Sequence, residues 1–406
     1  MRKFSAVIAA ICVFSTQFGV TVVAPLLGMW VSAVEQPYVA SALIFAAFTL
    51  VSTPLQIPAG KLSDKFGRKQ FIVAGLLLYA VASALFPIFS PSDASRTHAS
   101  SVSLCGLILA RALQGAGAGL FFPSITAFLT ERTSEAERGE AFSIYNIGLG
   151  AGLALGPLAG GALTNSLNAI APFVACVSLA LFSAFLVLFL VQEEKLTEAG
   201  AKRGKMSGKT SKKQKKALIL ACIVIFFGIG VAAIMSSMFS PYAKSKLNFS
   251  ETLIGIFISA MLAVFAILQR VLSGISRKIG EVPLATLGVL LCASGLASLA
   301  FTANPQAILL ISFILGAGLG AVSLSTLTLA SYAANIGEGA REGEIMGVYF
   351  TIFYAGLGTI PLICGFLSEI LGAERVFLLY ALTLFALAPF ILQAGRKLSL
   401  SGVSAS

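Results

Sequence analysis

The sequence predicts an all-α polytopic membrane protein with twelve membrane-spanning helices. Three observations predict it: a low content of charge, apolar runs long enough to span a bilayer, and basic residues gathered on one side. Of the 406 residues, 57% are hydrophobic and 11% are charged, and the mean hydropathy is +0.93. A soluble domain carries about 25% charged residues. This chain cannot cover itself with polar surface, so lipid must be its solvent.

The apolar runs follow one another along the whole chain, and most of them reach the ~20 residues that a helix needs to cross the hydrocarbon core. The predicted spans are residues 5–30, 38–59, 70–89, 102–128, 140–165, 170–192, 217–241, 252–270, 282–302, 305–333, 344–369 and 374–395. One long polar interruption divides them into six and six. We therefore predict an N-terminal six-helix bundle (1–192), a flexible cytoplasmic linker (193–216) and a C-terminal six-helix bundle (217–406).

Most of the 28 lysines and arginines lie near the N-terminus, in the linker and in alternate loops. This is the positive-inside bias of a multi-pass protein of the plasma membrane with both termini in the cytoplasm. The bias accounts for the formal net charge of +11, so no nucleic-acid partner is expected. For the linker lysines, solvation and orientation are a better explanation than binding of acidic lipid.

The residue types needed for catalysis or metal binding are missing from the predicted spans. These spans contain no histidine and no paired carboxylates, and no long soluble domain interrupts them. The six cysteines lie in apolar runs without metal-ligand spacing, as small packing residues do. We therefore expect no enzyme, no cofactor and no metal site.

A charged segment separates the second and third spans. Gly60-Lys61-Leu62-Ser63-Asp64-Lys65-Phe66-Gly67-Arg68-Lys69 holds five charges in ten residues, which places it in water at the cytoplasmic face. Gly60 and Gly67 predict a tight turn there. The segment resembles the signature loop G-x-L-[AS]-D-[RK]-x-G-R-[RK] of the major facilitator superfamily, at every fixed position. The resemblance implies the major facilitator fold, with two pseudo-symmetric six-helix bundles and a substrate site between them at mid-membrane.

The resemblance also implies a gate at the cytoplasmic side. Asp64 would cap the positive N-terminus of the eleventh helix, and the loop would link to an acid at the end of helix 4, a place filled by Glu131. The predicted gate residues are Gly60, Asp64, Gly67, Arg68, Glu131 and Arg138. The alternative is that the lysines merely anchor a short loop.

A second motif, Arg111-Ala112-Leu113-Gln114-Gly115-Ala116-Gly117-Ala118, resembles the family's R-x-x-Q-G-x-G-A in helix 4. Arg111 is the one basic residue that we place within a span, at a cost of about 2.5–3.5 kcal/mol. It must therefore face a partner or a wet cavity. We favour a cavity-lining charge that tunes protonation or meets substrate. The alternative is that Arg111 bonds carbonyl groups of helix 1 or snorkels.

Helix 5 carries glycine at every fourth position, which makes a smooth groove for close helix contact. The residues are Gly148, Gly152, Gly156, Pro157, Gly160 and Gly161. The run resembles the G-x-x-x-G-P-x-x-G-G element associated with exporters of the family. Packing alone would account for the glycines but not for the Gly-Pro-x-x-Gly-Gly ending.

The two halves carry an internal repeat, in which Gly115-Ala116-Gly117 aligns with Gly316-Ala317-Gly318. For the cavity we predict a coupling and binding set of Arg111, Gln114, Gln17, Tyr145, Asn146, Met238, Tyr349 and Tyr354. Exporters of the family commonly place a carboxylate in the cavity, on helix 1, 4 or 5, and this chain lacks one placed deep, so its coupling is expected to differ from the usual arrangement or to be weak.

The resemblance implies a secondary active transporter that exports lipophilic small molecules by alternating access, as a proton-coupled antiporter of the multidrug type. The alternative is a transporter of a defined small metabolite, such as a sugar, an organic anion or an amino acid, with Arg111 as an anion contact. The expected partners are a small-molecule substrate, protons and the lipid bilayer, and the expected state is a monomer.

Overall fold

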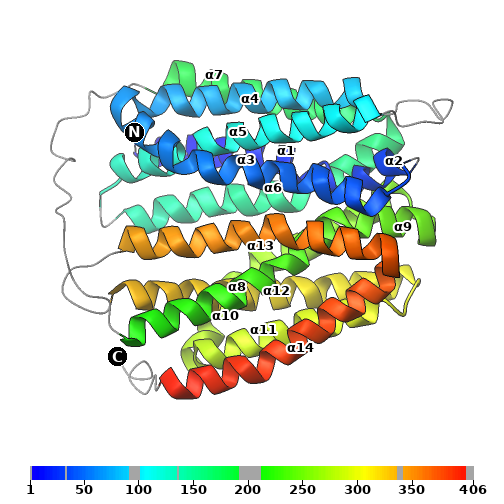
Figure 1. The fold of residues 1–406 in the computed structure, drawn as a ribbon. Coiled ribbons are helices and arrows are strands. Elements are labelled where there is room, and N and C mark those ends of the chain that lie inside the picture. Colours follow the sequence, from blue (N-terminus) through cyan, green and yellow to red (C-terminus); the bar gives the residue numbers. More distant parts are fainter. Residues whose placement is uncertain are drawn as a thin grey trace. The chain divides into compact units, whose positions relative to one another are not determined.

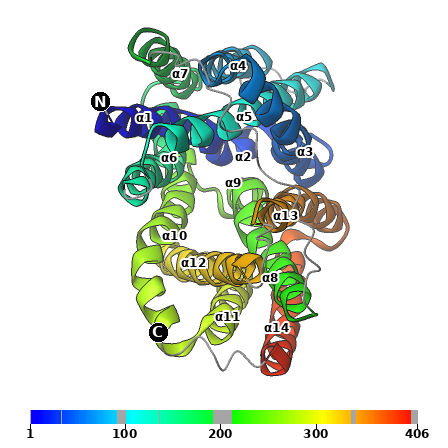
Figure 2. The ribbon, with the colours of Figure 1, turned by 90° about the vertical axis from the view of Figure 1, so that its left-hand side faces the viewer.

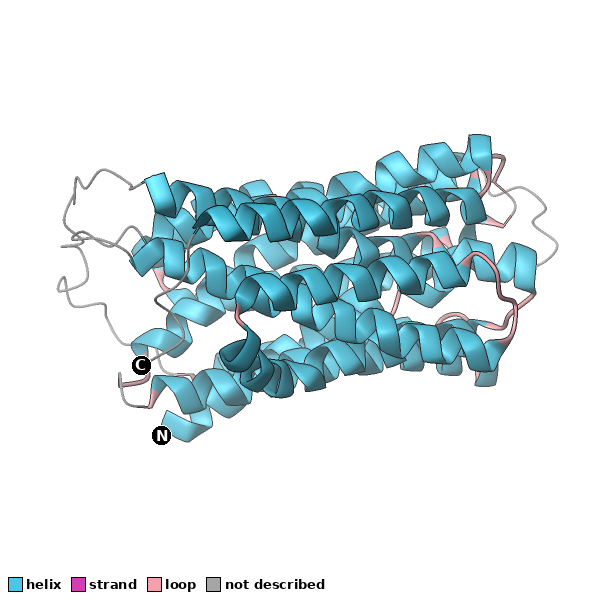
Figure 3. Ribbon diagram, turned by 90° about the horizontal axis from the view of Figure 1, so that it is seen from below, coloured by secondary structure: helices cyan, strands magenta, loops and turns pink. Residues whose placement is uncertain are grey.

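The structure, a computed structural model, describes residues 2–32, 34–90, 101–134, 137–191, 212–335 and 342–398. Every regular element among these residues is a helix, and none of them is a strand (Figure 3). Twelve of the described helices are long and apolar enough to cross a membrane. The predicted all-α architecture with twelve spans is therefore confirmed. Most of the predicted linker lies outside the described residues.

Contacts divide the chain into two compact units, Met1–Ala201 with Ser236–Ser259, and Lys202–Met235 with Ala260–Ser406. The segment 236–259 thus groups with the first unit, whereas the sequence placed it in the C-terminal bundle. The predicted bundle boundaries themselves stay a prediction.

The first unit is built on long helices that run side by side (Figure 1). Its elements are α1 (Arg2–Thr21), η1 (Ala24–Leu26), α2 (Leu27–Val31), α3 (Pro37–Phe66), α4 (Arg68–Phe89), α5 (Ser101–Glu131), α6 (Arg138–Ser166), α7 (Ala171–Leu190), α9 (Phe239–Leu247) and the start of α10 (Glu251–Ile279). Helix α5 packs against α3 and α4, α6 packs against α1, and α7 packs against α4 (Figure 2).

The second unit contains α8 (Lys212–Ser237), the rest of α10, α11 (Glu281–Leu299), α12 (Pro305–Asn335), α13 (Glu342–Leu371) and α14 (Ala373–Leu398). Helix α11 packs against both α12 and α14, and α13 also contacts these two helices.

Two predicted spans are interrupted by proline. The first divides into α1, η1 and α2 at Pro25, and the seventh ends at Ser237, with α9 following. A proline has no N–H, so it leaves the carbonyl four residues earlier without its helical hydrogen bond. For Pro241 that carbonyl belongs to Ser237, the last residue of α8.

Single glycines join consecutive helices at three places. Gly67, Gly280 and Gly372 have φ values of +105°, +86° and +86°, which side-chain-bearing residues rarely adopt. The predicted turn at Gly67 is therefore present, but Gly60 lies inside α3 and takes no part in it. The segment 61–66 is helical because its lysines and leucine are good helix formers, and a helix can continue into water.

The same glycine contact recurs in both units, which supports the internal repeat. A Cβ atom on Gly75 of α4 would lie 2.8 Å from the carbonyl oxygen of Gly117 on α5. A Cβ atom on Gly288 of α11 would lie 2.8 Å from the carbonyl oxygen of Gly318 on α12. In each unit, glycines on two neighbouring helices allow their backbones to touch.

Candidate functional site

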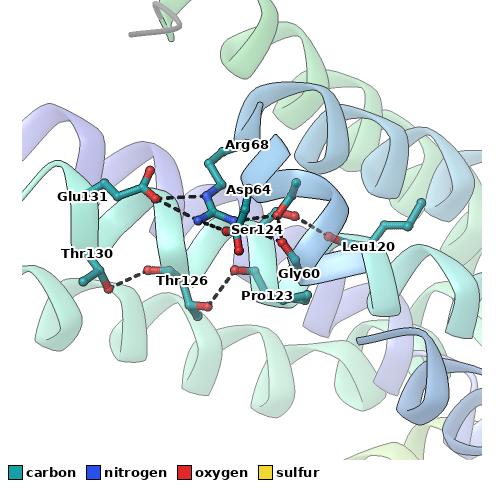
Figure 4. A network of polar contacts seen from close by, with 10 residues as sticks. Gly60, Asp64, Arg68, Leu120, Pro123, Ser124, Thr126, Thr130 and Glu131 are labelled. Atoms are coloured by element: carbon teal, nitrogen blue, oxygen red, sulfur yellow. Dashed lines mark hydrogen bonds and ion pairs between the residues drawn. The ribbon is translucent and has the colours of Figure 1, made fainter. Parts of the chain in front are cut away.

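Arg68 joins three helices at the end of the first unit where α3 meets α4 (Figure 4). Its Nε and Nη2 atoms donate to one carboxylate oxygen of Glu131, at 3.1 and 2.9 Å. Nη2 also forms an ion pair with Asp64, and Nη1 donates to the hydroxyl of Ser63 at 2.7 Å. One guanidinium group thus holds the end of α3 and the start of α4 against the last residue of α5.

The three charged side chains differ in burial. The side chain of Arg68 is 14% exposed, that of Glu131 is 39% exposed and that of Asp64 is 60% exposed. Charge-assisted hydrogen bonds are the stronger kind, but an ion pair to a carboxylate as exposed as Asp64 contributes little to stability. The contact with Glu131, made through two hydrogen bonds, is therefore the stronger of the two, and Asp64 keeps a carboxylate largely open to solvent.

The local backbone explains how these residues meet. Gly67 ends α3, its N–H donates to the carbonyl of Ser63 at 3.1 Å, and α4 begins at the next residue. Because a single residue separates the helices, Arg68 still reaches Asp64 four positions earlier. Of the predicted gate set, Asp64, Arg68 and Glu131 come together and Gly60 offers its carbonyl to Arg68 at 3.4 Å.

The other parts of the predicted gate stay predictions. Arg138 lies exposed at the start of α6, outside the network of Arg68. The proposed cap of the eleventh helix by Asp64 stays a prediction.

The second unit carries a sign-reversed counterpart of this turn, around Gly280. In the first unit an acid stands three residues before the glycine and a base one residue after it. In the second unit the base Arg277 comes first and the acid Glu281 follows. Among the described residues, the Oε2 atom of Glu281 is buried and has no hydrogen-bond partner.

Arg111 is buried in the middle of α5, at 2% exposure. Its Nη1 atom donates to the carbonyl of Val20 at 2.9 Å and to the Oε1 atom of Gln114 at 2.5 Å. The Gln114 Nε2 atom in turn donates to the carbonyl of Gly19 at 2.9 Å. The guanidinium also lies over two phenyl rings, with its carbon 5.2 Å from the ring centroid of Phe48.

These contacts are those of the alternative interpretation, in which Arg111 bonds carbonyls of helix 1. Val20 lies in the last turn of α1, where the helix dipole favours a positive charge. The Arg111 Nε atom has no partner among the described residues. The predicted role of the Arg111 charge in protonation or substrate binding stays a prediction.

The glycines of α6 form a seam with the backbone of α1. Ideal Cβ atoms on Gly148 and Gly160 would clash with the carbonyl oxygens of Ala10 and Val22, and one on Gly152 would lie 2.6 Å from that of Phe14. Gly156 lies against the side chain of Thr21 in the same way. The close helix contact expected of this motif is therefore made along four turns of α6.

The end of the motif faces a different helix. A Cβ atom on Gly161 would clash with the carbonyl of Glu251, the first residue of α10. The carbonyl of Gly161 also accepts a hydrogen bond from the hydroxyl of Thr252 at 3.1 Å. The carbonyl of Pro157 occupies the place of a side chain on Gly255. The Gly-Pro-x-x-Gly-Gly ending thus has a packing partner of its own, within the first unit.

The other predicted cavity residues of the first unit differ in burial, and their binding role stays a prediction. Gln17 is half-buried beside Gly152, whereas Asn146 is exposed. Tyr145 is buried in an apolar cluster, and Met238, the residue just before α9 in the sequence, is fully buried. The sequence could not separate core from cavity, because aromatic and thioether side chains suit both.

In the second unit, Tyr349 is buried on α13, with its hydroxyl 3.0 Å from that of Thr326 on α12. Tyr354, further along α13, is half-buried. The binding role of both tyrosines stays a prediction. Among the described residues, no group of three His, Cys, Asp or Glu could hold a metal ion.

A buried ion pair joins two residues that were not predicted to form a site. Glu251 is 6% exposed, and its Oε1 atom lies 2.6 Å from the Nζ atom of Lys244. Glu251 stands at the start of a predicted span, a position that gives no sign of burial. The sequence feature that indicates this pair is the basic residue Lys244 seven positions before the acidic residue Glu251, with a short turn between their helices.

Comparison with known proteins gives the family and its relatives. Residues 9–361 match the family model described as Major Facilitator Superfamily. The chain is 28% identical to multidrug resistance protein 1 of Bacillus subtilis over 328 residues, which are 80% of this chain and 79% of that one. It is 24% identical to the quinolone resistance protein NorA of Staphylococcus aureus, over 88% of each chain. An uncharacterized MFS-type transporter of Methanocaldococcus jannaschii is 24% identical over 90% of this chain and 92% of its own.

Solved structures share the fold. A POT family transporter in complex with a thioalcohol-conjugated peptide has a TM-score of 0.76 at 14% identity, over 97% of this chain and 96% of that one. A bacterial homologue of the human lysosomal transporter Spinster, in an inward-facing and unoccupied conformation, has a TM-score of 0.74 at 14% identity with the same coverage.

Proposed function

The chain belongs to the major facilitator superfamily, and from this premise we propose that it exports lipophilic small molecules by alternating access, in exchange for protons. It is a multi-pass membrane protein with twelve helices long enough to span. The distribution of lysine and arginine supports a plasma-membrane location with both termini in the cytoplasm. On this orientation, the network of Asp64, Arg68 and Glu131 lies at the cytoplasmic face.

The observation that carries the proposal is the seam between α6 and α1. Four glycines on α6 meet backbone or side-chain atoms of the first span at distances that exclude any Cβ atom, and the seam ends in the Gly-Pro-x-x-Gly-Gly element. This element is associated with exporters of the family. The names of two relatives, a multidrug resistance protein and a quinolone resistance protein, support the same direction and the same class of lipophilic substrate.

The network around Arg68 fits a cytoplasmic gate. It fastens the ends of α3, α4 and α5 through one guanidinium group, and the carboxylate of Asp64, although paired with Arg68, is exposed and accessible to a helix N-terminus. A cap of this kind is worth about 0.3–1 kcal/mol at an exposed site. Energies of this size suit a latch that must open in every cycle.

Arg111 and Gln114 fit a structural role, in which they hold the end of α1. They satisfy the carbonyls of Gly19 and Val20 just before the proline that interrupts the first span. A transporter of an organic anion, the second candidate, would need the guanidinium free to meet its substrate. Arg111 is 2% exposed and already donates to two acceptors, which favours the exporter.

The test is transport in proteoliposomes with an imposed pH gradient. The purified protein is given fluorescent lipophilic compounds, uncharged and cationic, and in parallel labelled sugars, amino acids and organic anions. We expect accumulation of the lipophilic compounds that requires the gradient and collapses with a protonophore. Gradient-driven movement of a sugar, amino acid or organic anion alone would establish the second candidate instead.

A further inference from the structure

Residues 236–259, which include α9 and the first turns of α10, form a corner of the first unit. Helix α9 lies beside α2 (Figures 1 and 2) and also contacts α3 and η1. On the orientation proposed above, this corner lies at the outer face, and the network around Arg68 lies at the inner face. The polar contacts of the corner with α2, α3 and α6 keep this face of the first unit together.

The hydroxyl of Ser240 joins α9 to the junction between η1 and α2. It accepts a hydrogen bond from the N–H of Gly28 and donates one to the carbonyl of Pro25, both at 2.8 Å. The first span is interrupted at this junction, and buried backbone groups need hydrogen-bond partners. Ser240 is fully buried, so one side chain of α9 serves both a donor and an acceptor of the first span.

The hydroxyl of Ser41, on α3, makes the corresponding contact with the seventh span. It donates to the carbonyl of Ser237, the last residue of α8. In a continuous helix this carbonyl would accept from residue 241, but Pro241 has no N–H to donate. Ser41 and Ser237 are both fully buried. At each of the two interruptions, a serine from another helix therefore bonds to the backbone.

The backbones of α2 and α9 lie in contact because residue 28 is glycine. An ideal Cβ atom on Gly28 would lie 2.5 Å from the carbonyl oxygen of Ser240 and 3.0 Å from the Cβ atom of Lys244. A side chain at this position would force the two helices apart. The hydrogen bonds of Ser240 would then be lost together with the close contact.

A threonine fastens the corner to α6 on its other side. The hydroxyl of Thr252 donates to the carbonyl of Gly161 at 3.1 Å and accepts from the Nδ2 atom of Asn165 at 3.0 Å. Since Gly161 has no side chain, the backbone of α10 approaches it directly. The contact with α6 is thus of the same kind as the contacts with α2 and α3, a hydroxyl group bonded to backbone.

These contacts differ in kind from those of the cytoplasmic network. The segments that the corner contacts, residues 24–31, 37–45 and 157–166, contain no charged residue, so the polar contacts with them are made by neutral groups. The ion pair of Lys244 with Glu251 lies within the corner and joins α9 to α10. Salt screens exposed ion pairs such as those of the cytoplasmic network, but it has little effect on buried hydrogen bonds between neutral groups.

We propose that Ser41 and Ser240 are positioning residues of an outer latch. Their hydroxyls hold residues 236–259 against α2 and α3 and keep the outer side of the first unit closed. The latch opens when these hydrogen bonds are exchanged for bonds to water. The proposal rests on the proposed function, which supplies the orientation and the alternation between two sides. It assigns neutral hydrogen bonds to the outer side, in contrast to the ionic network at the inner side.

Opening this latch exposes backbone groups rather than charges. When α9 leaves α2 and α3, the N–H of Gly28 and the carbonyls of Pro25 and Ser237 lose the serine partners described above. Water must take the place of these partners, because a buried polar group without one is unfavourable. Hydrogen exchange detects this step, since the amide of Gly28 exchanges when its hydrogen bond opens.

The test is hydrogen exchange of the full-length protein in nanodiscs, without substrate, with one peptide followed at each side. Residues 24–31 hold the Gly28 amide at the outer side, and residues 60–70 hold the turn at Gly67 at the inner side. In Ser240→Ala we expect exchange of 24–31 to rise about tenfold, because two hydrogen bonds are lost. Exchange of 60–70 should fall, because opening of one side accompanies closing of the other.

Two further variants keep the test decisive if Ser240→Ala folds poorly. Gly28→Ala changes no hydrogen-bonding side chain but forces α2 away from α9, and it should give the same opposite changes at the two sides. Ser41→Ala should also give them, at a smaller size, because it removes a single hydrogen bond. The control is Ser245→Ala, which removes an exposed hydroxyl from α9 and should exchange as the wild type. Melting temperatures are recorded for every variant.

Three results would overturn the latch. The first is unchanged exchange of residues 24–31 in both Ser240→Ala and Gly28→Ala. The second is a rise at the outer side without a fall at the inner side, since a contact that only stabilises the fold gives this result. The third is wild-type exchange of 24–31 that rises between about 0.05 M and about 1 M NaCl, which would show that charges hold the corner. No transport is measured, so a protein that exports no lipophilic compound but shows the opposite changes keeps the latch and loses the proposed substrate.

Discussion

Arg68 and Glu131 are joined by two hydrogen bonds to a single oxygen atom, at 2.9 and 3.1 Å, across 63 residues of sequence. The second acid of the network, Asp64, lies at the end of α3 beside the turn. Arg68 therefore fixes this end of the first unit through Glu131. The carboxylate of Asp64, which is more exposed, remains open to solvent.

Asp64→Asn should leave the protein folded and reduce transport. The carboxylate is 60% exposed, so losing its pair with Arg68 should cost at most about 1 kcal/mol of stability. The amide cannot cap a helix N-terminus as strongly as a carboxylate does. The measurement is gradient-driven uptake in proteoliposomes together with a thermal melt, and Lys61→Gln, an exposed neighbour, is the control. Unchanged turnover would show that Asp64 is not part of a cytoplasmic gate.

Arg111→Ala should abolish coupled flux and also destabilise the protein. It leaves the carbonyl of Val20 and the Oε1 atom of Gln114 without a donor, at about 1–3 kcal/mol for each buried group. Arg111→Lys keeps the charge and separates the two effects. If Arg111→Lys melts near the wild type but moves no substrate, the guanidinium serves transport.

The control for Arg111 is Arg270→Ala, which removes an exposed arginine from α10. A fully active Arg111→Ala protein would show that Arg111 has only a structural role.

Gly152→Ala should force α1 and α6 apart. The new methyl group would lie 2.6 Å from the carbonyl of Phe14 and 2.9 Å from the Cβ atom of Gln17, and overpacking of this kind costs about 1–3 kcal/mol. Gly139→Ala, at the start of the same helix with nothing within 4 Å, should be neutral or stabilising by about 0.4–1 kcal/mol. Denaturation in detergent compares the two, and equal stability would mean that the seam can relax.

Gly67→Ala should strain the one-residue turn between α3 and α4. A residue with a side chain at φ +105° costs about 1–3 kcal/mol, and the strain would move Arg68 relative to Asp64 and Glu131. Gly60→Ala is the matched control, because Gly60 is helical and its Cβ atom would make an ordinary 3.6 Å contact with Pro123. Similar melting temperatures for both variants would show that the turn adapts.

The spans could be predicted because lipid burial depends on local composition. The seam of Gly148, Gly152 and Gly160 could be predicted because its spacing is a property of one helix. The turn at Gly67 was predicted, but the helical conformation of residues 61–66 was not. Charged residues are typical of a loop and also of the end of a helix. Burial of Glu251 could not be predicted, because it is set by Gly161, ninety positions away in the chain.

The seam between α1 and α6 has a mechanical consequence. Carbonyl oxygens of one helix occupy the places where side chains would begin on the other, so the two cannot slide past each other except by a full turn, about 5.4 Å. The two helices must therefore move together as one rigid unit. Movement of this helix pair relative to the rest of the first span is then taken up where the regular helix is interrupted, at Pro25.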